Sequence, residues 1–231
     1  MTKIPKHKQI LEFQSFSDLV RTPFEGDVNA HFWNRQLQGD FQEIVEKLQL
    51  KENITEIHLG DLHALELSDC GLKAKEIIST DFQLLSDYGA QPSLNLIKCY
   101  PRDDEFDLIT TDVYSFHVDR SPIATDTFLC TYYGASSDIL PNDQAIQKIK
   151  IPEIRAELKK LCPGSDKEFD LFLRDYFFDL HYEATESAQP INLENGFLWR
   201  IAVDHPNQKV LPCIHRAPME NDHEYRLLLI C

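Results

Sequence analysis

The sequence lacks a long hydrophobic run, and no stretch approaches the roughly 18 consecutive apolar residues of a membrane-spanning helix. Residues 1–8 are basic, but no apolar segment and no small-residue cleavage site follow them, so we expect no signal peptide. There is also no internal repeat and no low-complexity segment. These absences predict a cytoplasmic protein with no membrane partner.

Cysteine pairs at the spacing of metal knuckles are missing too. The 6 cysteines include no C-x-x-C pair, which argues against a structural zinc knuckle. A chain of 231 residues is large enough to fold without disulfides, so we expect reduced thiols. Cys99, Cys130 and Cys213 lie in apolar, strand-like runs, where a free cysteine packs as a small core residue.

Clusters of positive charge are absent from a strongly acidic chain. The 23 Lys and Arg residues are outnumbered by 38 Asp and Glu, and the formal net charge is −15. A surface of this sign repels the phosphate backbone of nucleic acids. We therefore expect no nucleic-acid partner.

The composition, with 42% hydrophobic and 26% charged residues, is typical of a soluble globular protein and favours a single domain over residues 1–231. Residues 1–90 are expected to form an N-terminal arm followed by helices. The arm, residues 1–35, has scattered aromatic side chains and is predicted to pack irregularly on the core. Helices are predicted over residues 39–51 and 72–88, where apolar residues recur at spacings of three and four.

After residue 90 the pattern changes to that of strands. Alternating or short apolar runs predict strands over residues 93–100, 113–118, 127–133, 196–203, 210–215 and 225–231. A helical insert at about 143–190 interrupts them, with helices predicted over residues 152–161 and 167–180. Runs of strands with helices set apart predict an α+β class, built on an antiparallel sheet or a double-sheet jelly roll.

A His-x-Asp triplet and a distal histidine form the main candidate site. His117 and Asp119 are two residues apart, so in a strand they face the same way, while Phe116 and Val118 face the other. His215 ends an apolar run that a neighbouring strand can place opposite the pair. Two imidazoles and one carboxylate form the facial ligand set of non-heme Fe(II) oxygenases, which leaves three positions open. We predict these three residues to be ligands of Fe(II), with metal affinity that falls at acid pH.

Arg226 is the candidate anchor of a co-substrate. It begins an apolar run, where an arginine is a poor core residue unless an anion pairs with it. A guanidinium can grip a carboxylate through two parallel hydrogen bonds, and 2-oxoglutarate would supply that carboxylate. Thr131 and Tyr132 are further candidates for hydrogen bonds to the co-substrate, although both are also ordinary strand residues. Lys98 or Tyr100, on the preceding strand, is the candidate second partner of its carboxylate.

Other polar residues of the second half are assigned lesser roles. His181, His205 and His223 lie in polar segments, and we expect them to be solvated. Arg216 follows His215 directly, so in a regular strand it should face away from the metal and pair with an acidic group or order the rim.

Four segments, in order, resemble a known family: FHVD at residues 116–119, FLCTYYG at 128–134, HRAP at 215–218 and YRLLL at 225–229. The family is the bacterial domain of unknown function 1826, whose motifs run F-H-x-D, L-C-T-Y-x-G, H-R-S-P and R-L-L-L. The resemblance covers roughly residues 93–231. Ala217 stands where the family has Ser, and Tyr133 where it has Arg, so contacts with the substrate differ.

The order of these motifs is similar to that of the wider Fe(II)/2-oxoglutarate oxygenase superfamily. There a double-stranded β-helix, a cupin-like jelly roll, carries the H-x-D triplet, the distal histidine and a strand-borne arginine. The resemblance implies this fold for residues 91–231. It also implies that His117, Asp119 and His215 are iron ligands and that Arg226 is the co-substrate anchor.

The favoured function is therefore an oxidoreductase, an Fe(II)/2-oxoglutarate-dependent dioxygenase that hydroxylates a small molecule or a protein side chain. One alternative is a cupin-like protein that binds zinc without redox turnover, as a sensor or a hydrolase. A second is a non-catalytic interaction module whose acidic face binds a basic partner.

Overall fold

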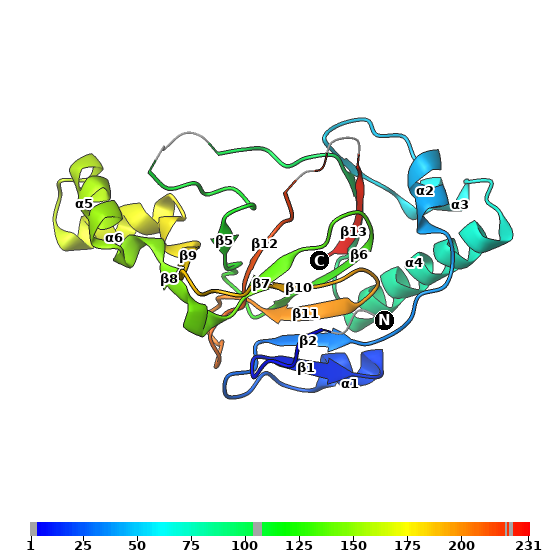
Figure 1. The fold of residues 1–231 in the computed structure, drawn as a ribbon, viewed down its shortest axis with the longest axis horizontal. Helices are drawn as coiled ribbons and strands as arrows, with labels where there is room; N and C mark the ends of the chain where they lie inside the picture. Colours follow the sequence, from blue (N-terminus) through cyan, green and yellow to red (C-terminus); the bar gives the residue numbers. More distant parts are fainter. Residues whose placement is uncertain (1–3, 104–107, 220, 222–223) are drawn as a thin grey trace.

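The computed structural model describes residues 4–103, 108–219, 221 and 224–231, and their strands form two β-sheets (Figure 1). The larger sheet contains, in pairing order, β1 (Ile10–Phe13), β2 (Ala30–Trp33), β11 (Leu198–Ala202), β6 (Asp126–Tyr133), β13 (Arg226–Ile230), β4 (Ser93–Ile97) and β3 (Ile54–Glu56). The smaller sheet contains β10 (Ile191–Asn192), β7 (Asp138–Leu140), β12 (Ile214–Arg216), β5 (Phe116–His117), β9 (His181–Ala184) and β8 (Ala145–Gln147). With helices added, the predicted α+β class is confirmed.

Six α-helices lie within the described residues. They are α1 (Phe16–Arg21), α2 (Phe41–Lys47), α3 (Leu59–His63), α4 (Asp69–Tyr88), α5 (Pro152–Leu161) and α6 (Asp166–Asp175). Figure 1 shows α5 and α6 beside β8 and β9, with α2, α3 and α4 at the opposite end. Within the described ranges, no helix combines the length and the apolar character needed to cross a bilayer.

The long helix α4 has clear start and stop signals. The Ser68 side chain accepts a hydrogen bond from the Gly71 backbone at its N-terminus. Gly89 ends the helix in the left-handed region, at φ +97°, where the missing side chain removes the steric cost. The predicted helix over residues 72–88 is thus confirmed and starts one turn earlier than expected.

Alternation along β6 separates two layers of the core. Phe128, Cys130 and Tyr132 belong to the cluster that packs against α2 and α4. Leu129, on the opposite face, belongs to a second cluster together with Ile139 of the smaller sheet. The second cluster therefore fills the space between the two sheets.

The expected irregular arm over residues 1–35 is wrong. This segment forms β1, α1 and β2, and β2 pairs with β11, which extends the larger sheet by two strands. Apolar side chains such as Phe32 lie in the layer between the sheets. The alternation was hidden because each of these strands is only 4 residues long.

Candidate metal centre

The smaller sheet brings the predicted metal ligands together. β5 pairs with β12 so that His117 lies directly opposite His215. Phe116 and Val118 pack with Ile214 in a cluster on the other face of these strands. Side chains directly opposite each other in neighbouring strands share a face, so both imidazoles point into the layer between the sheets.

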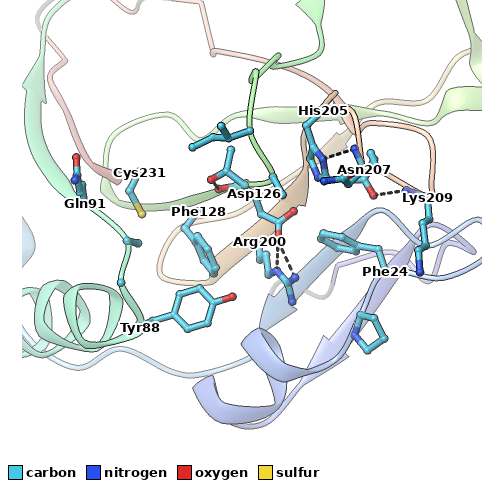
Figure 2. A pocket seen from close by; sticks show the side chains of 17 residues that line it. Phe24, Tyr88, Gln91, Asp126, Phe128, Arg200, His205, Asn207, Lys209 and Cys231 are labelled. Atoms are coloured by element: carbon cyan, nitrogen blue, oxygen red, sulfur yellow. Dashed lines mark hydrogen bonds and ion pairs between the residues drawn. The ribbon is translucent and has the colours of Figure 1, made fainter.

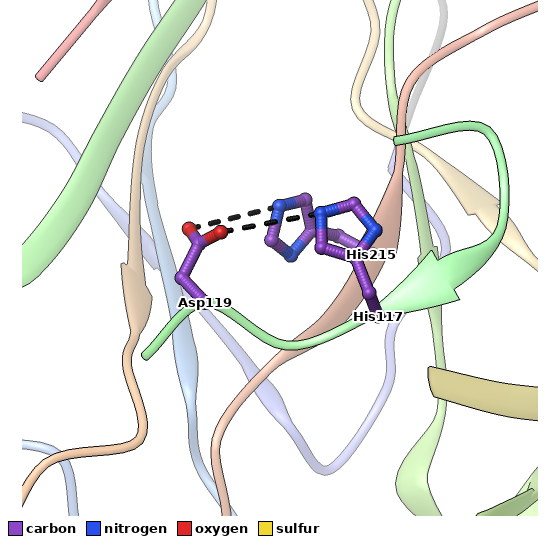
Figure 3. A group of neighbouring side chains, drawn as sticks. All are labelled: His117, Asp119 and His215. Atoms are coloured by element: carbon purple, nitrogen blue, oxygen red, sulfur yellow. Dashed lines mark ion pairs between the residues drawn. The ribbon is translucent and has the colours of Figure 1, made fainter. Parts of the chain in front are cut away.

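The three candidate ligands form a compact group (Figure 3). The Nε2 atom of His117 lies 4.0 Å from one carboxylate oxygen of Asp119, and the Nε2 atom of His215 lies 3.7 Å from the other. One donor atom from each residue lies within 4.8 Å of those of the other two. An Asp119 side chain that is 34% exposed keeps the group open on one side.

Neighbouring groups orient each ligand. The Nδ1 atom of His117 lies 2.7 Å from the Ser115 carbonyl, and that of His215 lies 3.3 Å from the Cys213 carbonyl. Donation from Nδ1 to these carbonyls leaves the Nε2 lone pairs for a metal. Thr127 donates a hydrogen bond of 2.6 Å to the Asp119 carboxylate.

The charge states suit a divalent cation. Burial, with the neighbouring His215, lowers the pKa of His117 to about 4, so its imidazole is neutral at pH 7. Burial alone would raise the pKa of Asp119, but His215, the Thr127 hydroxyl and His117 together bring it below its ordinary value. Two imidazoles, at least one of them neutral, and an ionised carboxylate match the nitrogen and oxygen ligands that iron and zinc accept.

The chain that follows Asp119 is held by a second set of contacts. The backbone carbonyl of Asp119 accepts a hydrogen bond of 2.8 Å from the backbone N–H of Asp204. Arg120 forms ion pairs with Asp204 at 2.9 Å and with Asp179 at 2.5 Å. These contacts fix the backbone on which the candidate carboxylate ligand depends.

Arg226 lies on the facing sheet and is 6% exposed. Its guanidinium donates to three hydroxyls, with distances of 2.9 Å to Thr131, 2.9 Å to Ser137 and 3.2 Å to Tyr100. Within the part of the chain that the structure describes, it forms no ion pair. A buried guanidinium surrounded by neutral hydroxyls is suited to an anionic ligand, because only an anion balances its charge.

The predicted co-substrate residues separate into two groups. Thr131 and Tyr100 contact Arg226, and Lys98 lines a small pocket together with Tyr100 and Arg226. Tyr132 lies on the other face of β6, where its hydroxyl donates to Asp81 of α4 at 2.6 Å. The structure therefore does not bring Tyr132 to this group, because adjacent residues of a strand point to opposite faces.

Several residues near the site were not predicted or were predicted wrongly. The expectation that His181 is solvated is wrong, since it is 3% exposed and lies directly opposite His117 in β9. The polar sequence around His181 does not indicate this long-range pairing. Thr127 could have been predicted, because it lies four residues from Thr131 and therefore on the same face of the strand. Ser137 lies in a connecting segment, where no such spacing indicates its position.

The lesser roles predicted for other residues are confirmed only in part. Arg216 faces away from the candidate ligands and pairs with Asp138 at 2.9 Å, as predicted. His205 is partly exposed, and His223 lies outside the described residues. Among the cysteines expected in the core, Cys130 and Cys213 are buried and Cys99 is partly buried.

A cleft of about 800 Å³ lies elsewhere and contains none of the candidate ligands. Figure 2 shows Arg200 on its wall, paired with Asp126. Arg200 also donates to three backbone carbonyls between residues 19 and 22. All the groups of the Arg200 guanidinium therefore have partners within the chain, and Arg200 offers no free cation to this cleft.

Comparison with known proteins identifies no relative. No family model matches the chain, and no curated protein or solved structure does so either. The geometry of the site is therefore the basis for its function.

Proposed function

We propose that this chain is an Fe(II)/2-oxoglutarate-dependent oxygenase, a hydroxylase built on a double-stranded β-helix. The observation that carries the proposal is the convergence of His117, Asp119 and His215 on one inner sheet face, with Arg226 buried on the facing sheet. Ser137 connects the two sides, since it accepts from Arg226 and lies two residues before Ile139, the strand partner of His215.

Each part of the site has a separate task. His117, Asp119 and His215 would hold the metal, and Arg226 with Thr131 would bind the distal carboxylate of 2-oxoglutarate. Iron held by these residues would supply dioxygen activation, and 2-oxoglutarate would be the two-electron reductant, so that one oxygen atom would enter succinate, released with carbon dioxide, and the other would enter a C–H bond of the prime substrate. The apolar layer between the sheets would exclude water from the inner side of the site.

An anaerobic titration tests the proposal. Adding 2-oxoglutarate to the Fe(II)-loaded protein should produce the visible metal-to-ligand charge-transfer band, which His117→Ala should abolish. Arg226→Met should weaken 2-oxoglutarate binding by about 3 kcal/mol, roughly a hundredfold, because charged hydrogen bonds are lost. The matched control is Arg155→Gln, a substitution in α5 of an arginine whose side chain is 45% exposed.

Two outcomes would contradict parts of this assignment. An unchanged band and affinity in Arg226→Met would show that the anchor lies elsewhere. Tight zinc in anaerobically purified protein, without 2-oxoglutarate binding, would favour the zinc-binding alternative.

A further inference from the structure

Three histidines form a row across adjacent strands of the smaller sheet. In β12, β5 and β9, His215 lies opposite His117, and His117 lies opposite His181. The ring centroids are 4.6 Å apart in the first pair and 5.7 Å apart in the second. Directly opposed residues share a sheet face, so His181 extends the row of candidate ligands outward by one strand.

His181 has an unmet hydrogen-bonding requirement. The residue is 3% exposed, and its Nδ1 atom has no hydrogen-bond partner among the described residues. Buried polar atoms are nearly always paired, because leaving one unpaired costs free energy. His181 is also not part of the three-residue group that could hold a single ion. A ligand from outside the chain would therefore account for the unpaired nitrogen of this buried imidazole at the end of the row.

Lys148 lies beside this row, in the short 3-10 helix η2 (Lys148–Lys150) that follows β8. Its ammonium donates to the Ser115 hydroxyl at 3.1 Å, and no described carboxylate lies within ion-pair distance of it. Burial lowers the pKa of Lys148, while Glu183 and Asp112 act at longer range in the opposite direction. A partly buried ammonium held only by a neutral hydroxyl can accept an anionic partner.

Among the described residues this ammonium has no ion-pair partner, and Glu183 and Asp112 act on it only at longer range. Asp119 and the co-substrate would offset the metal, and the distal carboxylate of the co-substrate would offset Arg226. Lys148 has no such partner in the described part of the chain. An oxyanion between Lys148 and His181 would offset the ammonium and accept from the imidazole.

We propose that His181, Lys148 and Ser115 form a subsite for an oxyanion of the prime substrate, a carboxylate or a phosphate ester, beside the metal centre. The assignment of this oxyanion to a prime substrate rests on the proposed oxygenase function. Held at this end of the row, the substrate would present a neighbouring C–H bond towards the ligands on β5 and β12.

The subsite can be tested with two simple probes, acetate and methyl phosphate. Zinc-loaded protein, which is diamagnetic, would be labelled in its histidine rings and titrated with each probe by nuclear magnetic resonance. The His181 signals should shift saturably with at least one probe, and the probe that binds more tightly identifies the oxyanion. Lys148→Ala should weaken this binding about tenfold, because one charged hydrogen bond is lost.

Lys150→Ala is the matched control, since Lys150 is exposed in the same 3-10 helix. It should bind the probe as the wild type does. Absence of any saturable shift at His181, or equal affinity in the wild type and Lys148→Ala, would overturn the subsite. His181→Gln is a second variant, and it should also bind the probe more weakly. Its unfolding transition would be measured to check that it is folded.

The charge-transfer band separates this proposal from the oxygenase assignment. Lys148→Ala should form the Fe(II)/2-oxoglutarate band as the wild type does, because Lys148 is not among the metal or co-substrate residues. A normal band with no Lys148-dependent oxyanion binding rejects the subsite alone. Lys148-dependent oxyanion binding without a band in the wild type rejects the oxygenase and keeps the oxyanion site.

Discussion

At the scale of single residues, the candidate centre depends on atoms that never touch the metal. The Asp119 carboxylate can rotate about its own side chain, and its orientation is set by the hydroxyl of Thr127 at 2.6 Å. Outside partners of this kind raise metal affinity because they hold a ligand in the binding orientation before the metal arrives. Asp119 also lies just outside β5, so regular strand pairing does not fix its position.

Thr127→Val should therefore weaken metal binding by about tenfold or more while the shape of the side chain is kept. Titration of the purified protein with Fe(II) or zinc, with a competing chelator, measures the change. Thr125→Val is the control, because Thr125 is exposed and close in sequence. Equal affinities in Thr127→Val and the wild type would show that the carboxylate is oriented by other contacts.

At the scale of elements, β6 serves two functions on its two faces. Thr131 points to Arg226 in the layer between the sheets. Tyr132, the next residue, donates to Asp81 on α4, and Asp81 also forms an ion pair with Arg35. One face of the strand therefore builds the candidate co-substrate site, while the other fastens a helix to the sheet.

Substitutions at these two neighbouring positions should have separate effects. Thr131→Val should weaken 2-oxoglutarate binding by about 1 kcal/mol, because Arg226 loses an oriented acceptor. Tyr132→Phe should lower the free energy of unfolding by about 2 kcal/mol, because a hydrogen bond to a buried carboxylate is lost, and should leave 2-oxoglutarate affinity unchanged. Isothermal titration and urea unfolding measure the two quantities. Weaker 2-oxoglutarate binding in Tyr132→Phe would contradict the division between faces.

The elements differ in how well the sequence predicts them. The helix over residues 152–161 matches α5, since a proline marks its start, and the strand over residues 127–133 matches β6 within one residue. Elements of two to four residues, such as β7 and β9, are too short for periodicity to emerge. The candidate ligand pair His117 and Asp119 could be predicted from local spacing. The contact between His117 and His181 could not, because it depends on how a distant insert returns to the sheet.

At the scale of the whole molecule, buried histidines connect stability to pH. His31 is fully buried between the rings of Phe13 and Phe24, and neither ring nitrogen forms a hydrogen bond of ordinary geometry with the described residues. Burial and the neighbouring Arg200 lower its pKa to about 4, against an opposing effect of the Leu19 carbonyl. The folded protein therefore keeps this imidazole neutral over a range in which the unfolded chain protonates it.

The free energy of unfolding should fall as the pH drops below about 6.5, where the unfolded histidine gains a proton, and the loss from His31 should be complete near its folded pKa of about 4. A shift of this size corresponds to roughly 3 kcal/mol. His117 and His181, with pKa values lowered to about 4 and about 3, act in the same direction. The fold should thus be most stable near neutral pH and lose stability well before its carboxylates are protonated.

His31→Leu and His31→Gln separate two destabilising effects of this buried ring, namely its titration and its unpaired polar atoms. Both remove the titration, so both should lose about 3 kcal/mol less than the wild type between pH 7 and pH 4. At pH 7 His31→Leu should also be more stable than His31→Gln, because only glutamine leaves polar atoms unpaired in the apolar site. Urea unfolding at a series of pH values measures both effects. If the free energy of unfolding of both variants changed with pH as steeply as that of the wild type, the protons taken up on unfolding would belong to other groups. His117 and His181 would be the next residues to test.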